Sequence, residues 1–263
     1  MWNENQKEAL LDVCRKHCYQ NAQNTLVPEP YLPYMPENWN GILILAEAQT
    51  PSPDYWEKLY SLNSIGEMTR LGHEELQSKQ VDIGVGPWDD WTIKLALQVI
   101  FETTKPTLKL EDVAVSNAVP WTKKTDGKNE NPDKEMQAKA AEFWKDIFGI
   151  WRPELKALVV LGNIAERVMK KADILQNEKW LKLRLPSKNA MCRVCGMFDC
   201  EGLQSRFPEV QKTKEAMEEA MDIQFKTWQI FFACHAVSLG VPKFKEWFGV
   251  GIEHSNLLPL EQQ

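Results

Sequence analysis

The stretch GILILAEAQT, residues 41–50, is the clearest indication of how this chain folds. A short apolar run that stops at turn-forming residues is typical of a buried strand in a parallel sheet. This run ends on a carboxylate, Glu47, and Gln49 and Thr50 then lead into a loop with two prolines. Ligands of open α/β sheets bind outside the carboxyl ends of the strands. Glu47 therefore lies where we expect a functional site, although an acid at a strand end also serves as a helix cap.

Three later segments repeat this strand pattern, and helical segments separate them. The further strands that we predict are VAVSNAV at 113–119, ALVVLG at 157–162 and KWLKLRLPS at 179–187. The predicted helices span 4–22, 54–80, 91–103, 134–150, 163–172, 209–222 and 225–247, the fourth of them capped by Asp133 or Asn131. Alternating strands and helices build layered α/β proteins. We predict a three-layer α/β/α sandwich around a mostly parallel four-stranded sheet.

Length and composition favour one domain of ordinary globular type. The chain has 263 residues, of which 43% are hydrophobic, enough for one large core. We expect a single domain over 1–263, with a helical and proline-rich extension over 1–40 and an insertion near 190–210. No apolar run has the length of a membrane span, and the first residues lack a signal-peptide pattern. We therefore expect a cytoplasmic protein that binds no membrane, and no obligate protein partner is evident.

Charge and cysteines limit the partners and cofactors. The net charge of −6 argues against a non-specific nucleic-acid coat, but it leaves room for a local basic groove. Six irregularly spaced cysteines favour reduced thiols or a metal site over a disulfide framework. The C-x2-C-x4-C set at 192–200, with Cys234 and His235, has zinc-like spacing. Free buried thiols are the commoner explanation of such cysteines, so we expect no metal and no cofactor.

Each predicted strand ends in a chemically distinctive loop. These loops are AEAQT at 46–50, SNAVPW at 116–121, LGNIAERV at 161–168 and LPSKNAMC at 185–192, and GPWDDW at 86–91 lies between the first two. In order and spacing they resemble the uracil-DNA glycosylase superfamily over about residues 41–192. AEAQT resembles the Gly-Glu-Ala-Pro-Gly motif of its bacterial iron–sulfur branch. LPSKNAMC is similar to the second catalytic motif, in the form found in thymine-DNA glycosylases.

The resemblance implies a glycosylase-like fold, DNA as the partner, and roles for particular residues. Glu47 matches the glutamate that orients the attacking water and stabilises an oxocarbenium-like sugar. An enzyme of this kind extrudes its target base, stacks it on a ring and reads its edge. Trp88 matches the stacking ring, with Trp91 as the alternative. Asn117 would read the base edge and assist catalysis, and Ala48 and Gln49 would complete the base pocket.

The resemblance also implies a surface that holds the DNA. Ser187 and nearby amides would grip a phosphate, and Met191 would be the wedge inserted into the vacated stack. A basic and polar rim would surround them, formed by Lys188, Asn189, Lys123, Lys124, Lys128, Lys182 and Arg184. Structural alternatives stay open: Asn117 as a turn brace, Trp88 or Met191 as core, and the lysines as a solvated face.

The chain departs from the family in three ways that bear on its substrate. Gln49 and Thr50 replace the Pro-Gly of the first motif, and Leu185 replaces the histidine that stabilises the departing base. About forty residues separate Glu47 from Trp88, and three roles are open for them: to wall the pocket, to enlarge it, or to cover bound DNA. An enlarged pocket would suit a hypermodified base. We therefore expect a DNA glycosylase for damaged, mismatched or modified pyrimidine-type bases, with hypermodified phage bases as one case. The alternatives are a catalytically impaired DNA- or base-binding relative and an unrelated α/β enzyme acting on nucleosides or nucleotides.

Overall fold

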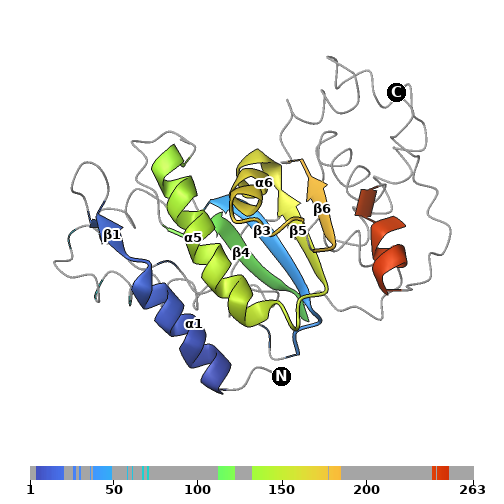
Figure 1. Cartoon of the computed structure of the whole chain (residues 1–263), viewed down its shortest axis with the longest axis horizontal. Coiled ribbons are helices and arrows are strands. Elements are labelled where there is room, and N and C mark those ends of the chain that lie inside the picture. Colours follow the sequence, from blue (N-terminus) through green and yellow to red (C-terminus); the bar gives the residue numbers. More distant parts are fainter. Residues whose placement is uncertain are drawn as a thin grey trace, which may run out of the picture. The chain divides into compact units, whose positions relative to one another are not determined.

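The structure is a computed structural model that divides the chain into two compact units. It describes residues 4–20, 26–27, 30, 36, 38–48, 58, 61, 67, 70, 112–121, 132–176, 178–184, 239–240 and 242–248 (Figure 1). One unit contains 1–89 and 111–182, and the other contains 90–110 and 183–263. The sheet and the labelled helices belong to the first unit, apart from the last residue of the final strand. In the second unit, the helical residues are 239–240 and 242–248.

Four parallel strands form the central sheet in the order β4-β3-β5-β6. Their bounds are Ile42–Ala48 for β3, Ala114–Val119 for β4, Ala157–Leu161 for β5 and Trp180–Leu183 for β6. This confirms the predicted α/β class and the parallel four-stranded sheet. The last strand is shorter than the predicted 179–187, and residues 185–187 lie outside the described residues.

Two helices pack on one face of this sheet, α5 (Lys134–Trp151) and α6 (Gly162–Lys171) (Figure 1). Of the two predicted caps for α5, Asp133 is the one used, since it accepts a hydrogen bond from the amide of Met136 at 2.7 Å. The Trp144 indole donates to the Ala118 carbonyl at 2.9 Å and ties α5 to β4. The packed face of the sheet is lined by Leu43, Leu45, Ala114, Ala118, Leu158 and Val160.

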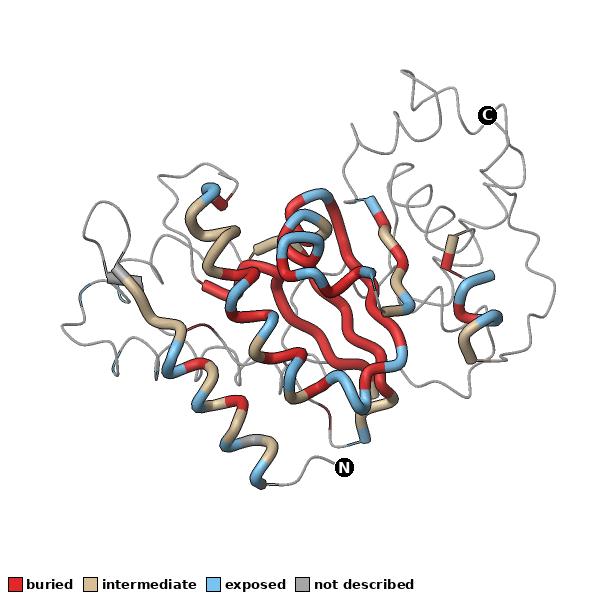
Figure 2. The backbone as a smooth tube through the Cα atoms, viewed as in Figure 1, coloured by how far each residue is buried: buried red, intermediate tan, exposed pale blue. Residues whose placement is uncertain are grey.

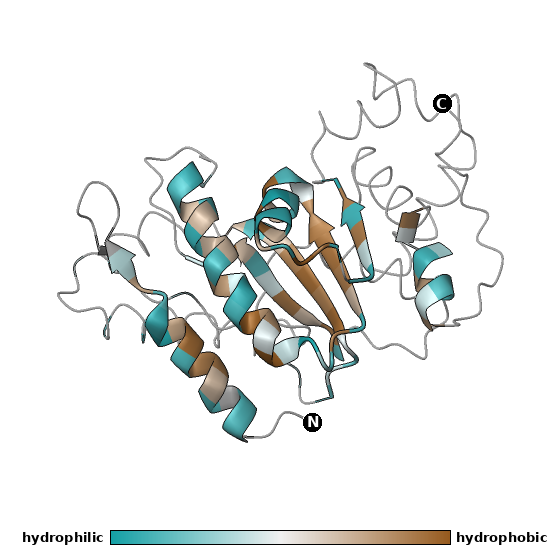
Figure 3. Ribbon diagram, in the orientation of Figure 1, coloured by the Kyte–Doolittle hydropathy of each residue, from teal (hydrophilic) through white to brown (hydrophobic). Residues whose placement is uncertain are grey.

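The other face of the sheet is buried as well. Ile42, Ile44 and Val159, which alternate with the residues facing the helices, are all fully buried (Figure 2). Strands of a parallel sheet are apolar on both faces for this reason, and β3 and β5 are accordingly hydrophobic over most of their length, whereas β4 and β6 contain polar residues (Figure 3). Continuous apolar runs such as ILILA are therefore a better sign of these strands than alternation.

Gly41 and the neighbouring Asn40 make backbone hydrogen bonds near the starts of three strands, β3, β4 and β5. The Gly41 carbonyl accepts hydrogen bonds from the amides of Lys156 at 2.8 Å and Ala157 at 3.2 Å, just where β5 begins. The neighbouring Asn40 receives the Ile42 amide on its side chain and donates its own amide to the Asp112 carbonyl ahead of β4. Gly41 has a φ of +87°, and a Cβ there would lie 2.7 Å from the Glu154 carbonyl oxygen. Only glycine fits this conformation in this space.

The first helix, α1, spans Glu4–Lys16 and ends earlier than the predicted 4–22. The His17 amide bonds to the Cys14 carbonyl at 3.1 Å, which tightens the last turn, and Tyr19–Gln20 (β1) then pairs with Leu26–Val27 (β2) in an antiparallel ribbon. The prediction of helix over 17–20 was wrong, since the chain turns at His17 and enters β1, and the His17 side chain has its partner on α5. None of the helices in the described ranges is long and apolar enough to cross a membrane.

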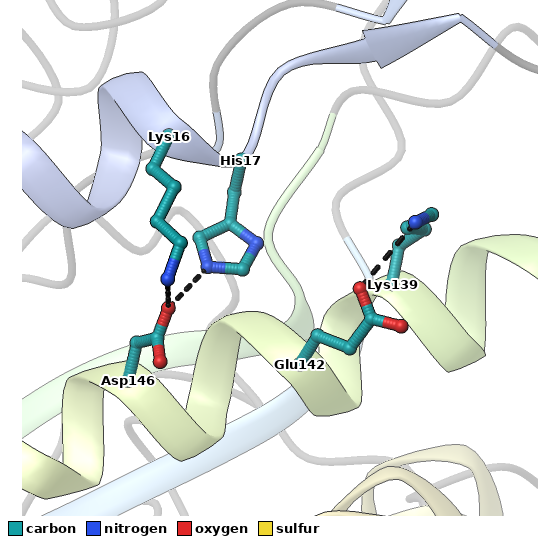
Figure 4. A network of polar contacts seen from close by, with 5 residues as sticks. All are labelled: Lys16, His17, Lys139, Glu142 and Asp146. Atoms are coloured by element: carbon teal, nitrogen blue, oxygen red, sulfur yellow. Dashed lines mark hydrogen bonds and ion pairs between the residues drawn. The ribbon is translucent and has the colours of Figure 1, made fainter.

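That partner is Asp146, which fastens the end of α1 to α5. Its Oδ2 accepts from Lys16 Nζ at 2.7 Å and pairs with His17 Nε2 at 2.8 Å (Figure 4). The His17 ring also meets Phe143 edge-on, at 5.6 Å between centroids. Burial by itself would raise the pKa of Asp146, but the hydrogen bonds and charges of Lys16 and His17 outweigh it and lower this pKa below its ordinary 3.8.

We expect Gly41→Ala to destabilise the protein by more than about 1–2 kcal/mol, because it combines a left-handed backbone with a steric clash. Gly149→Ala is the matched control. Gly149 is an exposed residue of α5, and a Cβ there meets no atom within 4 Å. Alanine at that position should raise stability by up to about 1 kcal/mol. Denaturant unfolding of both variants measures the difference, and equal effects would contradict this account of Gly41.

We expect Asp146→Asn to lower thermal stability near neutral pH, with a deficit that closes in acid. A carboxyl whose pKa is lowered by folding stabilises the protein above its unfolded pKa, and this stabilisation disappears as the pH falls through the folded pKa. The deficit should therefore shrink from about pH 4 downward. Glu142→Gln is the control, since the ion pair of Glu142 among the described residues is with Lys139 in α5 (Figure 4) and exposed pairs contribute little. A deficit unchanged at low pH would contradict the role of Asp146.

Candidate functional site

Glu47 lies one residue before the end of β3 and contacts the start of α6. Its Oε1 accepts a hydrogen bond from the backbone amide of Ile164 at 2.9 Å. The N-cap residue of α6, Leu161, provides no side-chain cap, and the first turn of the helix contains no acid. Glu47 therefore supplies from a neighbouring strand the negative charge that a helix N-terminus favours. The side chain stays half-buried.

The turn between β5 and α6 makes this contact possible. Gly162 has a φ of +84°, so the chain passes from the last strand residue, Leu161, directly into the helix. The exposed amides of the first helical turn are thereby placed beside the end of β3. Sequence reasoning missed this role of Ile164. A signal was present, since residue 161 is not one of the usual N-cap types and the cap must come from elsewhere.

Asn117 is a buried amide on the adjacent strand. It lies in β4, where it is paired in register with Ala46 of β3. Its side chain belongs to a residue only 6% exposed, and its Oδ1 is buried without a hydrogen-bond partner in the described part of the chain. Leaving a buried polar atom unsatisfied costs about 1–3 kcal/mol. Asn117 lies two residues before the end of β4, and the indole nitrogen of Trp121, just after this strand, is likewise buried with no partner among the described residues.

Glu47 and Asn117 lie near the same edge of the sheet, but their side chains point to opposite faces. The register aligns Ala46 with Asn117, and side chains alternate along a strand, so the Asn117 amide shares the face of Ala46. The Glu47 side chain points to the other face, where α6 lies. Ala48, half-buried and aligned with Val119, ends β3 at the same edge. A ligand that contacts both polar groups must lie across the carboxyl ends of β3 and β4.

Lys182, expected in a basic rim, connects β6 to α6. Its Nζ donates to Asn163 Oδ1 at 2.8 Å and also contacts the Glu166 carboxylate. Glu166 accepts from Lys170 at 2.8 Å as well. Hydrogen bonds from Lys170 and Lys182 lower the pKa of the Glu166 carboxyl, more strongly than its partial burial raises it. Arg184, the other described member of that rim, is exposed.

The remaining predicted site residues fall outside the described residues. They are Gln49, Trp88, Lys123, Lys124, Lys128, Leu185, Ser187, Lys188, Asn189 and Met191, together with Cys192, Cys195 and Cys200. Their predicted roles stay predictions. Among the residues that the structure describes, no group of three or more His, Cys, Asp and Glu side chains is arranged to hold a metal ion. The described site thus consists of Glu47, Ala48, Asn117 and the first turn of α6.

A scan against protein-family models and a search of curated proteins found no match to this chain.

We expect Glu47→Ala to destabilise the protein by about 1 kcal/mol, because the Ile164 amide loses its acceptor at the helix N-terminus. Glu47→Gln should cost less, since a side-chain amide oxygen still accepts that hydrogen bond. Thermal unfolding of the two variants beside the wild type tests the order. Equal stability of Glu47→Ala and the wild type would contradict the capping role.

Proposed function

We propose that this protein is a DNA glycosylase that hydrolyses the N-glycosidic bond of an extruded pyrimidine-type base and leaves an abasic site. One observation supports this most: a carboxylate held by a helix N-terminus and a buried amide with an unpartnered oxygen lie on neighbouring strands, near the carboxyl ends of β3 and β4 and on opposite faces of the sheet. The order of the strand-end motifs along the chain supports the same reaction. The proposal includes a glycosylase-like three-layer arrangement around the sheet and a cytoplasmic location.

The chemistry assigned to Glu47 follows from how its carboxylate is held. The Ile164 amide binds Oε1 and fixes the orientation of the group. The other oxygen, Oε2, is then left to orient a water molecule toward the sugar carbon. As the glycosidic bond breaks, its electron pair leaves with the base, and the carboxylate stabilises the oxocarbenium-like sugar. The water oxygen then bonds to that carbon, and its proton passes toward Glu47.

Asn117 is suited to recognise the extruded base. Its Oδ1 is an acceptor, so it would accept a hydrogen bond from an N–H on the base edge and thereby satisfy its own buried oxygen. Ala48 and Gln49 would border the base, and Trp88 would stack on it. Ser187, Lys188, Asn189, Met191, Lys123 and Lys124 would hold the DNA strand around it. These last roles rest on the motif resemblance alone.

The substrate class follows from Leu185. A leucine there cannot stabilise the departing base anion by a hydrogen bond, unlike the histidine found in many of the enzymes that it resembles. Bases that form a stable anion on their own would be released fastest. We therefore propose electron-poor or modified pyrimidines, including hypermodified phage bases, ahead of plain uracil.

A second candidate is a catalytically impaired DNA- or base-binding relative of the same fold. The hydrogen bond between Glu47 and the Ile164 amide favours this alternative, because it gives the carboxylate a structural task that does not require catalysis. An α/β enzyme acting on free nucleosides is a third class. It would turn over small molecules and show no affinity for duplex DNA.

Base release from DNA that contains uracil, mispaired thymine, hypoxanthine or glucosylated hydroxymethylcytosine tests the proposal. We expect abasic product from at least one modified pyrimidine. Glu47→Gln should reduce that rate at least about 100-fold, the order of loss when one electrostatic group is removed from a transition state, while the fold is kept. Glu142→Gln, a surface change on α5, should release base at the wild-type rate. DNA binding without abasic product from any substrate would favour the binding relative.

A further inference from the structure

The solvent side of α6 is positively charged in a chain whose net charge is −6. Arg167, Lys170 and Lys171 are exposed on this helix, and Lys182 of β6 reaches its first turn through Asn163. Much of the outer side of α6 is exposed and hydrophilic (Figures 2 and 3). We call these four residues the α6 basic face. Within the described residues, the carboxylate that they contact is Glu166, which Lys170 and Lys182 already bind. The face therefore keeps a net positive charge.

The helix dipole explains only part of this charge. Lysines in the last helical turn complement the dipole of α6, which accounts for Lys170 and Lys171. Arg167 lies in the middle of the helix, where that effect has faded. Arg167 and Lys171 are four residues apart, so they are neighbours on one side of the helix. Neither makes an ion pair with any residue that the structure describes.

The α6 basic face begins at the candidate site. The first turn of α6 binds Glu47 through the Ile164 amide, and the adjacent Asn163 binds Lys182. The ten residues of α6 span about 15 Å along the helix axis. This length is shorter than one turn of a DNA duplex, about 34 Å, so the face and the Glu47 carboxylate could both contact one turn of DNA. A nucleic acid whose base reaches the strand ends would pass within reach of these side chains.

We propose that the α6 basic face binds the phosphate backbone of the DNA duplex from which the base is extruded. This inference rests on the proposed function, and it assigns the partner a surface apart from the strand-end loops. Duplex DNA carries one negative charge for about every 1.7 Å of its axis, so a short positive helix face meets several phosphates. The Arg167 guanidinium presents a planar fork of donors that matches phosphate oxygens, and the lysines act as point charges.

The double variant Arg167→Gln/Lys171→Gln tests the face, with Lys156→Gln/Lys179→Gln as the matched control. The control lysines are exposed residues of the same sheet that precede β5 and β6, at its amino edge. Fluorescence anisotropy with an unmodified duplex, over a series of salt concentrations, gives the affinity and its salt dependence. The slope of log K against log salt is negative, and removing one charged side chain from a phosphate reduces its magnitude by about 0.9, so we expect the magnitude to fall by about 1.8 in the double variant. The control should match the wild type.

The outcomes separate this inference from the proposed function. A slope in the double variant equal to that of the wild type overturns the face as a phosphate-binding surface, even if base release is intact. An equal decrease in the control overturns it too, since net charge alone would then explain the result. A wild type that binds no duplex overturns both proposals. A reduced slope without base release from any substrate supports the face and rejects the glycosylase. In an active enzyme, the double variant should raise KM and leave kcat unchanged.

Discussion

The hydrogen bond from the Ile164 amide to the Glu47 carboxylate connects the end of one strand to the beginning of a helix that follows another. It depends on Gly162, whose left-handed backbone lets β5 pass into α6 without a linking loop. The same bond orients the one carboxylate at the carboxyl end of the central strand β3. This one hydrogen bond therefore both caps the N-terminus of α6 and fixes the position of the Glu47 carboxylate. Charge at a helix N-terminus is favourable whether or not the acid has a further task.

Ser116 and Asn117 of β4 are polar side chains in a sheet whose other buried side chains, in the described strands, are apolar. The sheet is buried on both faces. The Asn117 oxygen is buried with no partner among the described residues, as is the Trp121 indole nitrogen, whereas the Trp144 indole is paired with the backbone. A group that donates a hydrogen bond to the Asn117 oxygen would satisfy it.

Much of the architecture was readable from residue order. The predicted starts of the four strands agree closely with the observed ones, because buried parallel strands are apolar on both faces and stand out as continuous runs such as ALVVL. Residue type limited the cap of α5 to Asp133 or Asn131, and the structure uses Asp133. The end of α1 was not predictable in the same way. His17 fits the helical spacing, but the helix ends at Lys16, and His17 contacts Asp146 of α5, a residue more than a hundred positions away.

Residue order alone was enough to establish the α/β class, the four strands and the presence of Glu47 and Asn117 at strand ends, because these depend on local patterns of apolar and polar residues. How those side chains are used became clear only in three dimensions. The register of β3 and β4 sets the two groups on opposite faces of the sheet. The packing of α6 against the sheet gives Glu47 a hydrogen-bond partner. Lys182, which the sequence predicted to lie in a basic rim, instead forms an ion pair with Glu166 of α6. Each of these contacts joins residues of different elements, so no local pattern contains them.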